Sequence, residues 1–342
     1  MSHRYPAARL CRDERPSREL VSFLEGVEFG GQGLRYRRKH LLPALERLDD
    51  PVFLSLREDD AIRASYALTD SAASLDGQPL AAVYRGLLAV DPARRRRGLG
   101  RRLVESALAG IEARSAGQPF LSFGLIEAEN TASLRLLESL GATDVGKLES
   151  RLVYRQWPRR STRLVELDSG LAGAFERQLS AQRGDRGLTL RASARYPAYG
   201  LVDGGDLLAA ARVGVTTLDL GAGGPLARFL HRNAYGRFRM LGKRYNRRAF
   251  RYLTIHDPLV GDDADAWPGF LQGLLAHHDT HMALFTLDAR SDVAARLGTA
   301  GLFGRFAKTT QQDLVLVASG WNLGDGWTER IRSAPVTGGP VF

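Results

Sequence analysis

The feature that most constrains this chain is a strand, a basic glycine turn and a helix that follow one another within residues 86–106, GLLAVDPARRRRGLGRRLVES. An apolar β-prone run ends at Asp91-Pro92, and four arginines and Gly98-Leu99-Gly100 lead into a helical pattern. The start of a helix carries backbone N–H groups without intrahelical acceptors and the positive end of the helix dipole. Because glycine lets an anion approach the backbone closely, the segment predicts a cradle for a pyrophosphate.

The cradle fits neither the dinucleotide-binding G-x-G-x-x-G motif nor the G-x-x-x-x-G-K-[ST] P-loop. The pattern present is Arg-x-x-Gly-x-Gly, formed by Arg95, Gly98 and Gly100, with Val90 and Pro92 upstream. It resembles the acyl-CoA loop of the GNAT superfamily of N-acyltransferases. A solvated arginine run before an ordinary helix is the alternative interpretation.

A second segment supports the resemblance. It contains Asn130, Ser133, Leu134, Glu138, Gly141 and Ala142. This order resembles the N-x-x-A…G-F segment that follows the fifth strand in the GNAT family. The resemblance extends over residues 1–157, and it implies an acyl-CoA-binding catalytic domain there.

Length and composition favour two ordinary globular domains. The chain has 342 residues, of which 44% are hydrophobic and 25% charged. It contains no apolar run long enough to cross a bilayer and no apolar core of a signal peptide near its start. Cys11 is the single cysteine, which excludes an intramolecular disulfide and favours a cytoplasmic location. The net charge of +10 favours anionic partners such as CoA, a phosphorylated substrate, RNA or an acidic membrane.

Hydrophobic periodicity and turn residues predict the elements of the first half. The expected strands are Ala7–Cys11, Val52–Leu56, Ala61–Thr69, Leu80–Val90, Phe120–Ile126 and Val145–Arg155, and the expected helices are 17–25, 36–48, Gly98–Arg114 and one that begins at Asn130.

The second half repeats this order in weaker form after a basic, proline-containing stretch at Arg155–Arg163. The expected strands are Arg163–Leu167, Leu188–Ser193, Tyr199–Val202, Asp206–Thr217, Arg251–Val260, Met282–Leu287 and Asp313–Ser319, and the expected helices are Leu171–Gln182, Ala266–His278 and Asp292–Thr299. We therefore predict an α/β (α+β) protein with two GNAT-like domains in tandem, 1–157 and 158–342. Each domain is expected to be a mixed, mostly antiparallel sheet flanked by helices.

The second domain lacks the features of the cradle. Gly-Asp-Asp-Ala-Asp-Ala-Trp-Pro follows Val260, with no arginine, no glycine pair and three aspartates that would repel a pyrophosphate. We expect a degenerate GNAT-like domain with an acceptor-site or structural role.

The resemblance assigns residues to acetyl-CoA or another acyl-CoA as cosubstrate, with no metal. It implies that the fourth strand diverges from the fifth, so that acyl-pantetheine lies between them. The implied binding residues are Leu88, Ala89, Val90, Arg95, Arg96, Arg97, Gly98, Leu99, Gly100, Arg101, Asn130 and Ser133. A helix cap is the alternative role for Asn130.

The catalytic candidates lie on the two central strands. Glu127 is the candidate general base, with Glu129 beside it, although two solvated carboxylates before a helix are an equal alternative. Tyr84 and Arg85 are candidates for substrate contact, and because neighbouring side chains on a strand face opposite ways, at most one of them is expected to reach the site. Many family members place a tyrosine general acid where this chain has Leu137.

Two weaker patterns remain. Residues 228–252 interleave basic and aromatic side chains, which suits RNA, an acidic substrate or a solvated helix. The three histidines His277, His278 and His281, with Asp279 among them, have spacing compatible with a metal, but no further ligand is apparent elsewhere in the sequence.

The sequence therefore favours an acyl-CoA-dependent N-acyltransferase that transfers an acyl group to an amine. The alternatives are a non-catalytic CoA-binding or scaffold protein and an RNA- or aminoacyl-tRNA-directed transferase that uses residues 228–252. The acceptor, the acyl length and the oligomeric state stay open.

Overall fold

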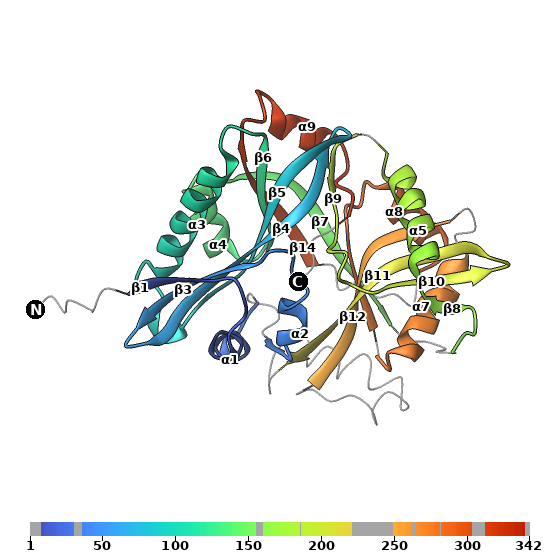
Figure 1. The fold of residues 1–342 in the computed structure, drawn as a ribbon, viewed down its shortest axis with the longest axis horizontal. Helices are drawn as coiled ribbons and strands as arrows, with labels where there is room; N and C mark the ends of the chain where they lie inside the picture. Colours follow the sequence, from blue (N-terminus) through green and yellow to red (C-terminus); the bar gives the residue numbers. More distant parts are fainter. Residues whose placement is uncertain are drawn as a thin grey trace, which may run out of the picture.

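The structure, a computed structural model, describes residues 8–30, 36–154, 160–184, 186–220, 249–261, 265–280, 282–302 and 312–338. Its strands and helices form two halves that lie side by side and share one long, strongly curved sheet (Figure 1). The chain is a mixed α/β protein whose sheet is mostly antiparallel, as the sequence predicts.

The first half follows the predicted order closely. Its strands are β1 (Arg9–Asp13), β2 (Arg37–Lys39), β3 (Val52–Glu58), β4 (Ala61–Leu75), β5 (Gln78–Val90), β6 (Phe120–Glu127) and β7 (Thr143–Tyr154), and its helices are α1 (Arg18–Gly26), α2 (Leu42–Leu45), α3 (Leu99–Ser115) and α4 (Thr131–Glu138).

The second half repeats this order. Its strands are β8 (Leu164–Glu166), β9 (Leu188–Leu190), β10 (Ala198–Asp203), β11 (Asp206–Asp219), β12 (Phe250–Val260), β13 (Met282–Leu287) and β14 (Gln312–Trp321), and its helices are α5 (Ser169–Arg183), α7 (Ala266–His277), α8 (Asp292–Thr299) and α9 (Trp327–Ser333).

The strand order of the sheet is symmetric: counted inward from either end, the strands of the first half correspond to those of the second, β1 to β8, β3 to β10 and so on to β14 and β7. It is β1-β3-β4-β5-β6-β14-β7-β13-β12-β11-β10-β8. Each half has one parallel pair, β5 with β6 and β12 with β13, and the other pairs along this order are antiparallel. This symmetry is what a duplicated unit produces.

The two halves exchange their last strands. β14, the closing strand of the second half, inserts between β6 and β7 and pairs with both, from Leu314↔Glu127 to Trp321↔Phe120 on one side. β7, the closing strand of the first half, pairs with β13 of the second. Leu316 of β14 is fully buried in a cluster with Leu121 and Phe123 of the first half. Each half therefore needs a strand of the other to complete its core.

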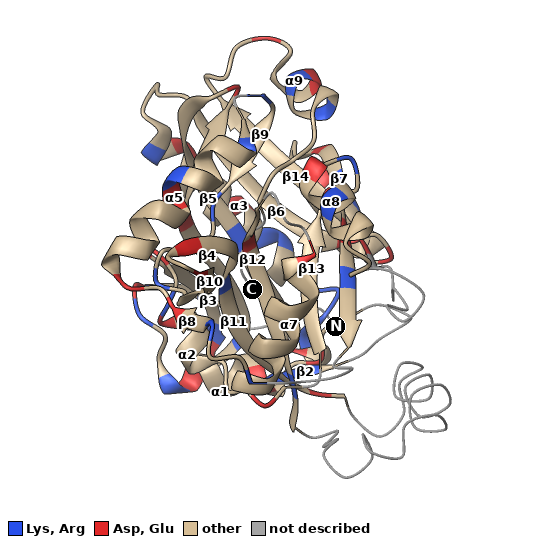
Figure 2. Cartoon of the chain, turned by 90° about the vertical axis from the view of Figure 1, so that its right-hand side faces the viewer, with Lys and Arg blue, Asp and Glu red and all other residues tan. Residues whose placement is uncertain are grey.

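Helices cover both faces of the sheet. α3 and α4 pack on one face of the first half, where Leu103, Val104 and Ile111 are buried, and α1 and α2 cover the other face. α5 packs on one face of the second half, and α7 and α8 pack on the other. On the side shown in Figure 2, α5 and α8 each carry both acidic and basic residues.

Three expectations about the fold were wrong. Residues 36–48 were expected to be helical with a break or kink at Pro43, but they form β2 and the short α2, with Pro43 in the first turn of α2. Leu188–Ser193 was expected to pair within the second half, but β9 pairs with β4 of the first. Asp313–Ser319 was expected to close the second half, but β14 lies between β6 and β7.

The strand exchange predicts that residues 1–160 do not fold alone as a monomer. Without β14, the facing edges of β6 and β7 keep unpaired backbone groups and the cluster around Leu121 loses its cover. Thermal unfolding followed by circular dichroism is expected to show no cooperative transition for this fragment. Adding the separately produced fragment 161–342 is expected to restore one. A cooperative transition from the monomeric first fragment by itself would contradict the exchange.

Candidate functional site

The two central strands of the first half separate after a short parallel pairing. β5 and β6 pair from Ala81↔Phe120 to Tyr84↔Phe123, yet β5 continues to Val90 and β6 to Glu127. Leu87, with φ 53°, forms a bulge in β5 opposite a register shift in β4. The divergence that the resemblance implies is therefore confirmed. We call the space between the separated ends of β5 and β6 the split.

The backbone of β5 presents polar groups to the split. The N–H of Asp91 donates to the carbonyl of Arg63 on β4 at 2.8 Å. Because backbone groups alternate along a strand, the N–H of Val90 and the carbonyl of Leu88 point the other way, toward the split. Leu88 and Val90 are half-buried and Ala89 is buried. The expected pantetheine-binding residues thus line the split.

The arginine run forms a turn between β5 and α3. Arg94 points back and pairs with the buried Glu58 at 2.8 Å, which ties the turn to β3. Arg95, Arg96 and Arg97 are exposed, and Arg96 has a left-handed backbone with φ 62°. The turn therefore presents three exposed guanidinium groups beside the N-terminus of α3.

Gly98 and Gly100 meet different constraints. Gly98 is the N-cap of α3 and has φ 78°, which side chains adopt only with strain. A Cβ at Gly100 would lie 3.7 Å from Val90 Cγ2 and 3.8 Å from Leu136 Cδ2, so a methyl group fits there but a larger group meets these side chains. The conformation of the turn therefore depends on Gly98. The small size of Gly100 keeps open the space between α3, Val90 and Leu136.

The remaining predicted binding residues lie around α3 and α4. Leu99 is buried and anchors α3. Arg101 pairs with Glu105 at 3.2 Å and donates to the Ser139 hydroxyl at 2.8 Å, which links α3 to α4. Asn130 accepts from the N–H of Ser133 at 3.2 Å and caps α4. The capping role of Asn130 is confirmed, and its contact with pantetheine stays a prediction.

The catalytic candidates occupy different environments. Glu127 is half-buried at the end of β6, and its charge reinforces the effect of burial in raising the pKa of Tyr36. Glu129 is exposed in the turn that follows. Tyr84 is buried against Phe123, with ring centroids 5.4 Å apart, and burial raises its pKa. Leu137, on α4, is buried in the core between the helices and the sheet, and a leucine side chain has no proton to donate. Of these groups, Glu127 combines a carboxylate with partial access at the split.

On the Glu127 side of the sheet, three tyrosines and an arginine form a cluster that the sequence analysis did not identify. They are Tyr36, Arg38, Tyr84 and Tyr252. Tyr36 and Arg38 come from the β2 segment, which pairs with β11 of the second half. Burial raises the pKa of Tyr252, on β12, to about 12 although the Arg38 charge opposes it. Tyr36 and Arg38 also affect the pKa of Tyr84. Both halves therefore build this side of the split, and the Tyr-x-Arg pattern was hidden in the expected helix.

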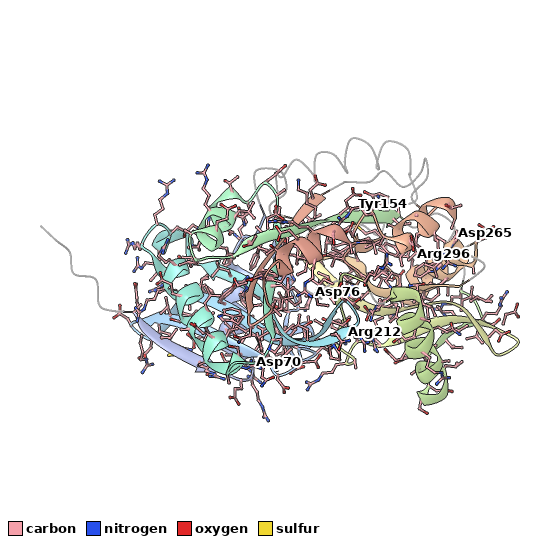
Figure 3. The ribbon with its side chains drawn as sticks, turned by 90° about the horizontal axis from the view of Figure 1, so that it is seen from above. Asp70, Asp76, Tyr154, Arg212, Asp265 and Arg296 are labelled. Carbon is pink, nitrogen blue, oxygen red and sulfur yellow. The ribbon has the colours of Figure 1, made fainter. Side chains whose placement is uncertain are left out.

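The second half has an equivalent split whose backbone groups are bonded by side chains. β12 pairs with β13 only from Leu253 to Ile255, and Asp257 forms the matching bulge with φ 50°. Asp257 is 2% exposed and pairs with Arg183 and Arg212. Burial raises the pKa of Asp257 against the effect of both arginines. Arg212 also pairs with Glu176 of α5, beside which it lies in Figure 3.

Side chains bond the backbone of β12 beyond the bulge, and Gln182 bonds the two groups that match the split-facing groups of Leu88 and Val90. Gln182 donates to the carbonyl of Pro258 at 2.8 Å and accepts from the N–H of Val260 at 2.7 Å. The indole of Trp267 donates to the carbonyl of Leu259 at 3.0 Å, and Arg296 donates to the carbonyl of Gly261. These positions match Leu88, Ala89, Val90 and Asp91 of the first half. The backbone of the second half is therefore satisfied from within.

The weaker sequence patterns gain no support. Within the described parts of the chain, no three His, Cys, Asp or Glu side chains form a group able to hold a metal ion. The ring of Tyr199 contacts that of His277 at a tilt and that of His278 edge-on, and His281 lies outside the described residues. Most of the basic stretch 228–252 also lies outside them, since residues 221–248 are not described. None of the described helices is long and apolar enough to span a membrane.

Comparison with known proteins agrees with this architecture. Residues 80–150 match the family described as FR47-like protein, which covers β5, the arginine turn, α3, β6 and α4. No curated protein matches the chain.

Two solved structures extend the comparison to both halves. Saccharomyces cerevisiae N-myristoyltransferase with bound myristoyl-CoA is 9% identical, with a TM-score of 0.60 over 91% of this chain and 82% of that one. A protein of Enterococcus faecalis described as a probable N-acyltransferase is 12% identical, with a TM-score of 0.50 over 93% of this chain and 74% of that one. At such identities the likeness shows a shared fold.

The fold consists of two halves with the same strand order, each with a parallel pair of strands that separate beyond it. Residues 80–150 thus match the FR47-like family, and the fold of the whole chain is similar to that of the N-myristoyltransferase.

His256, next to the bulge of β12, is expected to make stability depend on pH. Burial lowers its pKa to about 3, and its Nε2 has no partner. Because the unfolded chain binds a proton below pH 6.5 and the folded chain does not, the free energy of unfolding falls as the pH drops from 6.5 toward 3. The slope is at most about 1.4 kcal/mol per pH unit.

Urea unfolding at pH 7 and pH 5 measures this dependence. His256→Phe is expected to lose less stability between the two than the wild type. The control is His40→Asn, at an exposed histidine whose left-handed backbone Asn tolerates. An equal loss in wild type and His256→Phe would show that His256 does not couple folding to protons.

Proposed function

We propose that this chain is an acyl-CoA-dependent N-acyltransferase that transfers an acyl group, acetyl in the simplest case, to the amine of an acceptor. Residues 1–157 would bind acyl-CoA and carry the chemistry, with β14 completing their sheet. Residues 158–342 would form the degenerate half and shape the acceptor side. The observation that carries the proposal is the split between β5 and β6, opening toward the arginine turn and α3.

The split suits the three parts of acyl-CoA. The exposed Arg95, Arg96 and Arg97 and the amides at the start of α3 suit the pyrophosphate. The backbone groups of Leu88 and Val90 suit the amides of pantetheine. The thioester would then lie near the bulge at Leu87, where a backbone N–H can polarise its carbonyl.

The reaction joins the acceptor nitrogen to the acyl carbon and breaks the bond from that carbon to sulfur. Glu127 would take the proton that the amine loses, directly or through a water molecule. The thiolate leaves without a proton from Leu137, which an alkyl thiolate with a pKa near that of free cysteine tolerates. Positioning along the split would supply much of the rate.

The second half would contribute to the face of the split from which the amine acceptor approaches, the face that contains Glu127. Tyr252 belongs to it, and β11 holds the segment that carries Tyr36 and Arg38. In its own split, Gln182 bonds the carbonyl of Pro258 and the N–H of Val260, which favours a single acyl-CoA site per chain.

Two other functions stay open as weaker candidates. A non-catalytic CoA-binding or scaffold protein would share the split and is favoured by the loss of a general acid at Leu137. An RNA- or aminoacyl-tRNA-directed transferase would use residues 228–252. Release of thiol from acetyl-CoA that depends on an added amine separates the first candidate from an enzyme.

The arginine turn predicts a specific loss of CoA affinity in Gly98→Val. The left-handed backbone at Gly98 costs a branched side chain about 1–3 kcal/mol of strain, which displaces the first amides of α3. Calorimetry is expected to show at least a tenfold weaker Kd for acetyl-CoA, since tenfold is about 1.4 kcal/mol. Gly110→Val is the control, because Gly110 lies on the same helix, is exposed and has no heavy atom within 4 Å of its Cβ position. Unchanged affinity in a folded Gly98→Val protein would remove the basis for the site.

Glu127→Gln is expected to lower kcat by about 10²–10⁴ while leaving the KM for acyl-CoA unchanged, because it removes the base and no CoA contact. Thiol release with a panel of amines measures both constants. Glu129→Gln is the matched control, since Glu129 is exposed two residues further along. Equal activity of the two variants would assign the proton transfer to another group.

A further inference from the structure

Among the described residues, Arg85 of the first half is a buried cation whose guanidinium has no hydrogen-bond partner. Arg85 is 3% exposed, and its Nε, Nη1 and Nη2 make no hydrogen bond. A guanidinium stays charged and offers five N–H donors in a planar fork. A buried charge without a counter-charge is costly, and buried donors in proteins are nearly always bonded. The guanidinium of Arg85 therefore requires an acceptor that the described residues do not supply.

Arg85 lies at the closed end of the split. It follows Tyr84, the last residue of β5 that pairs with β6. A Cβ at Gly124 of β6 would lie 3.0 Å from the carbonyl oxygen of Arg85 and 3.8 Å from its Cβ. The two strands thus touch at Arg85 and Gly124 and separate beyond them. A side chain at position 124 would crowd this point.

The side chain of Arg85 belongs to the α3 side of the sheet. Arg85 pairs with Leu68, and Leu68 and Val83 pack in the cluster under α3. Glu127 lies on the opposite face, because Ile126 packs in that cluster and side chains alternate. The guanidinium and the proposed base therefore lie on different sides of the sheet.

Other polar groups accompany Arg85 on this face. The Arg85 charge opposes the rise that burial causes in the pKa of Tyr66. The hydroxyls of Ser122 and Ser319 are buried without partners, and the pairings of Val83 with Ser122 and of Ser122 with Ser319 put them on the α3 side. An otherwise apolar layer thus contains a guanidinium and two hydroxyls that are free to bond a ligand.

We propose that Arg85 binds a carboxylate of the substrate at the closed end of the split. The inference rests on the proposed function, because acyl-CoA held at the arginine turn and along Leu88–Val90 directs its acyl group toward Arg85. A carboxylate matches the guanidinium fork with two parallel hydrogen bonds. It comes either from the far end of a dicarboxylic acyl chain, such as succinyl, or from the amine acceptor. The position of Arg85 away from Glu127 favours the acyl chain.

Calorimetry with matched thioesters tests the acyl source. Succinyl-CoA and butyryl-CoA have the same chain length and differ by a carboxylate. The wild type is expected to bind succinyl-CoA at least tenfold tighter, and Arg85→Met to lose this preference while its Kd for free CoA changes less than twofold. Arg85→Lys, which keeps the charge without the fork, is expected to keep part of the preference. Arg12→Met, at an exposed arginine, is the control.

Thiol release from acetyl-CoA tests the acceptor source. An amino acid and its carboxamide present the same amine with and without a carboxylate. If the acceptor supplies the carboxylate, the wild type prefers the amino acid in kcat/KM at least tenfold and Arg85→Met abolishes that preference. The thioester preference is then absent. A loss of kcat in Arg85→Met that is equal for every thioester and amine would overturn the proposal, since it would place Arg85 at the reacting carbonyl.

A thermal shift with succinate alone separates this proposal from the proposed function. Succinate is expected to raise the Tm of the wild type more than that of Arg85→Met, with butyramide as the uncharged comparison. If the wild type binds no CoA but succinate discriminates the two proteins, the carboxylate site stands and the acyltransferase does not. A different result would refute the carboxylate site and leave the acyltransferase standing. In that case CoA binds, but Arg85→Met and the wild type respond equally to the thioesters, the amines and succinate.

Discussion

The antiparallel pairing of β7 with β14 is the interaction on which the rest of the structure depends. It lies at the centre of the sheet, and each of its strands belongs by sequence to one half and completes the core of the other. Because both strands are bonded on both edges, neither half can move away from the other without breaking ladder hydrogen bonds on two sides. The side of the split that contains Tyr36, Arg38 and Tyr252 therefore has a fixed geometry although its residues come from both halves.

The two halves show how one backbone can keep or lose a binding site. Both contain a short parallel pairing, a bulge with a positive φ and strands that separate beyond it. In the second half, Gln182 and Trp267 bond the exposed backbone and Asp257 is neutralised by Arg183 and Arg212. In the first half, the corresponding groups of Leu88 and Val90 face the split, and a cation is buried at its end. Side chains, rather than strand geometry, distinguish the two.

Much of the first half could be predicted because its signals are local. The glycine turn at Gly98, the cap at Asn130 and the paired aspartates of the β3–β4 turn each act within a few residues. The exchange of β14 could not be predicted, since alternation shows that Asp313–Ser319 is a strand but not which edges it joins. The helix expected at 36–48 failed because β2 is stabilised by pairing with β11, far along the chain. For the same reason the meeting of Tyr36, Arg38 and Glu127 left no trace in the sequence pattern, and Arg85 could be placed on a strand but not recognised as lacking a partner.

The position of β14 near the end of the chain also determines when the sheet can be completed during synthesis. β6 and β7 are complete by residue 154, but the strand that separates them ends at residue 321. A ribosome therefore releases the first half long before its central partner exists, and contacts between residues so distant in sequence form slowly. Until then β6 and β7 lack the strand that lies between them in the finished sheet. A chain with this topology cannot complete the core of its first half until its last strand has been made.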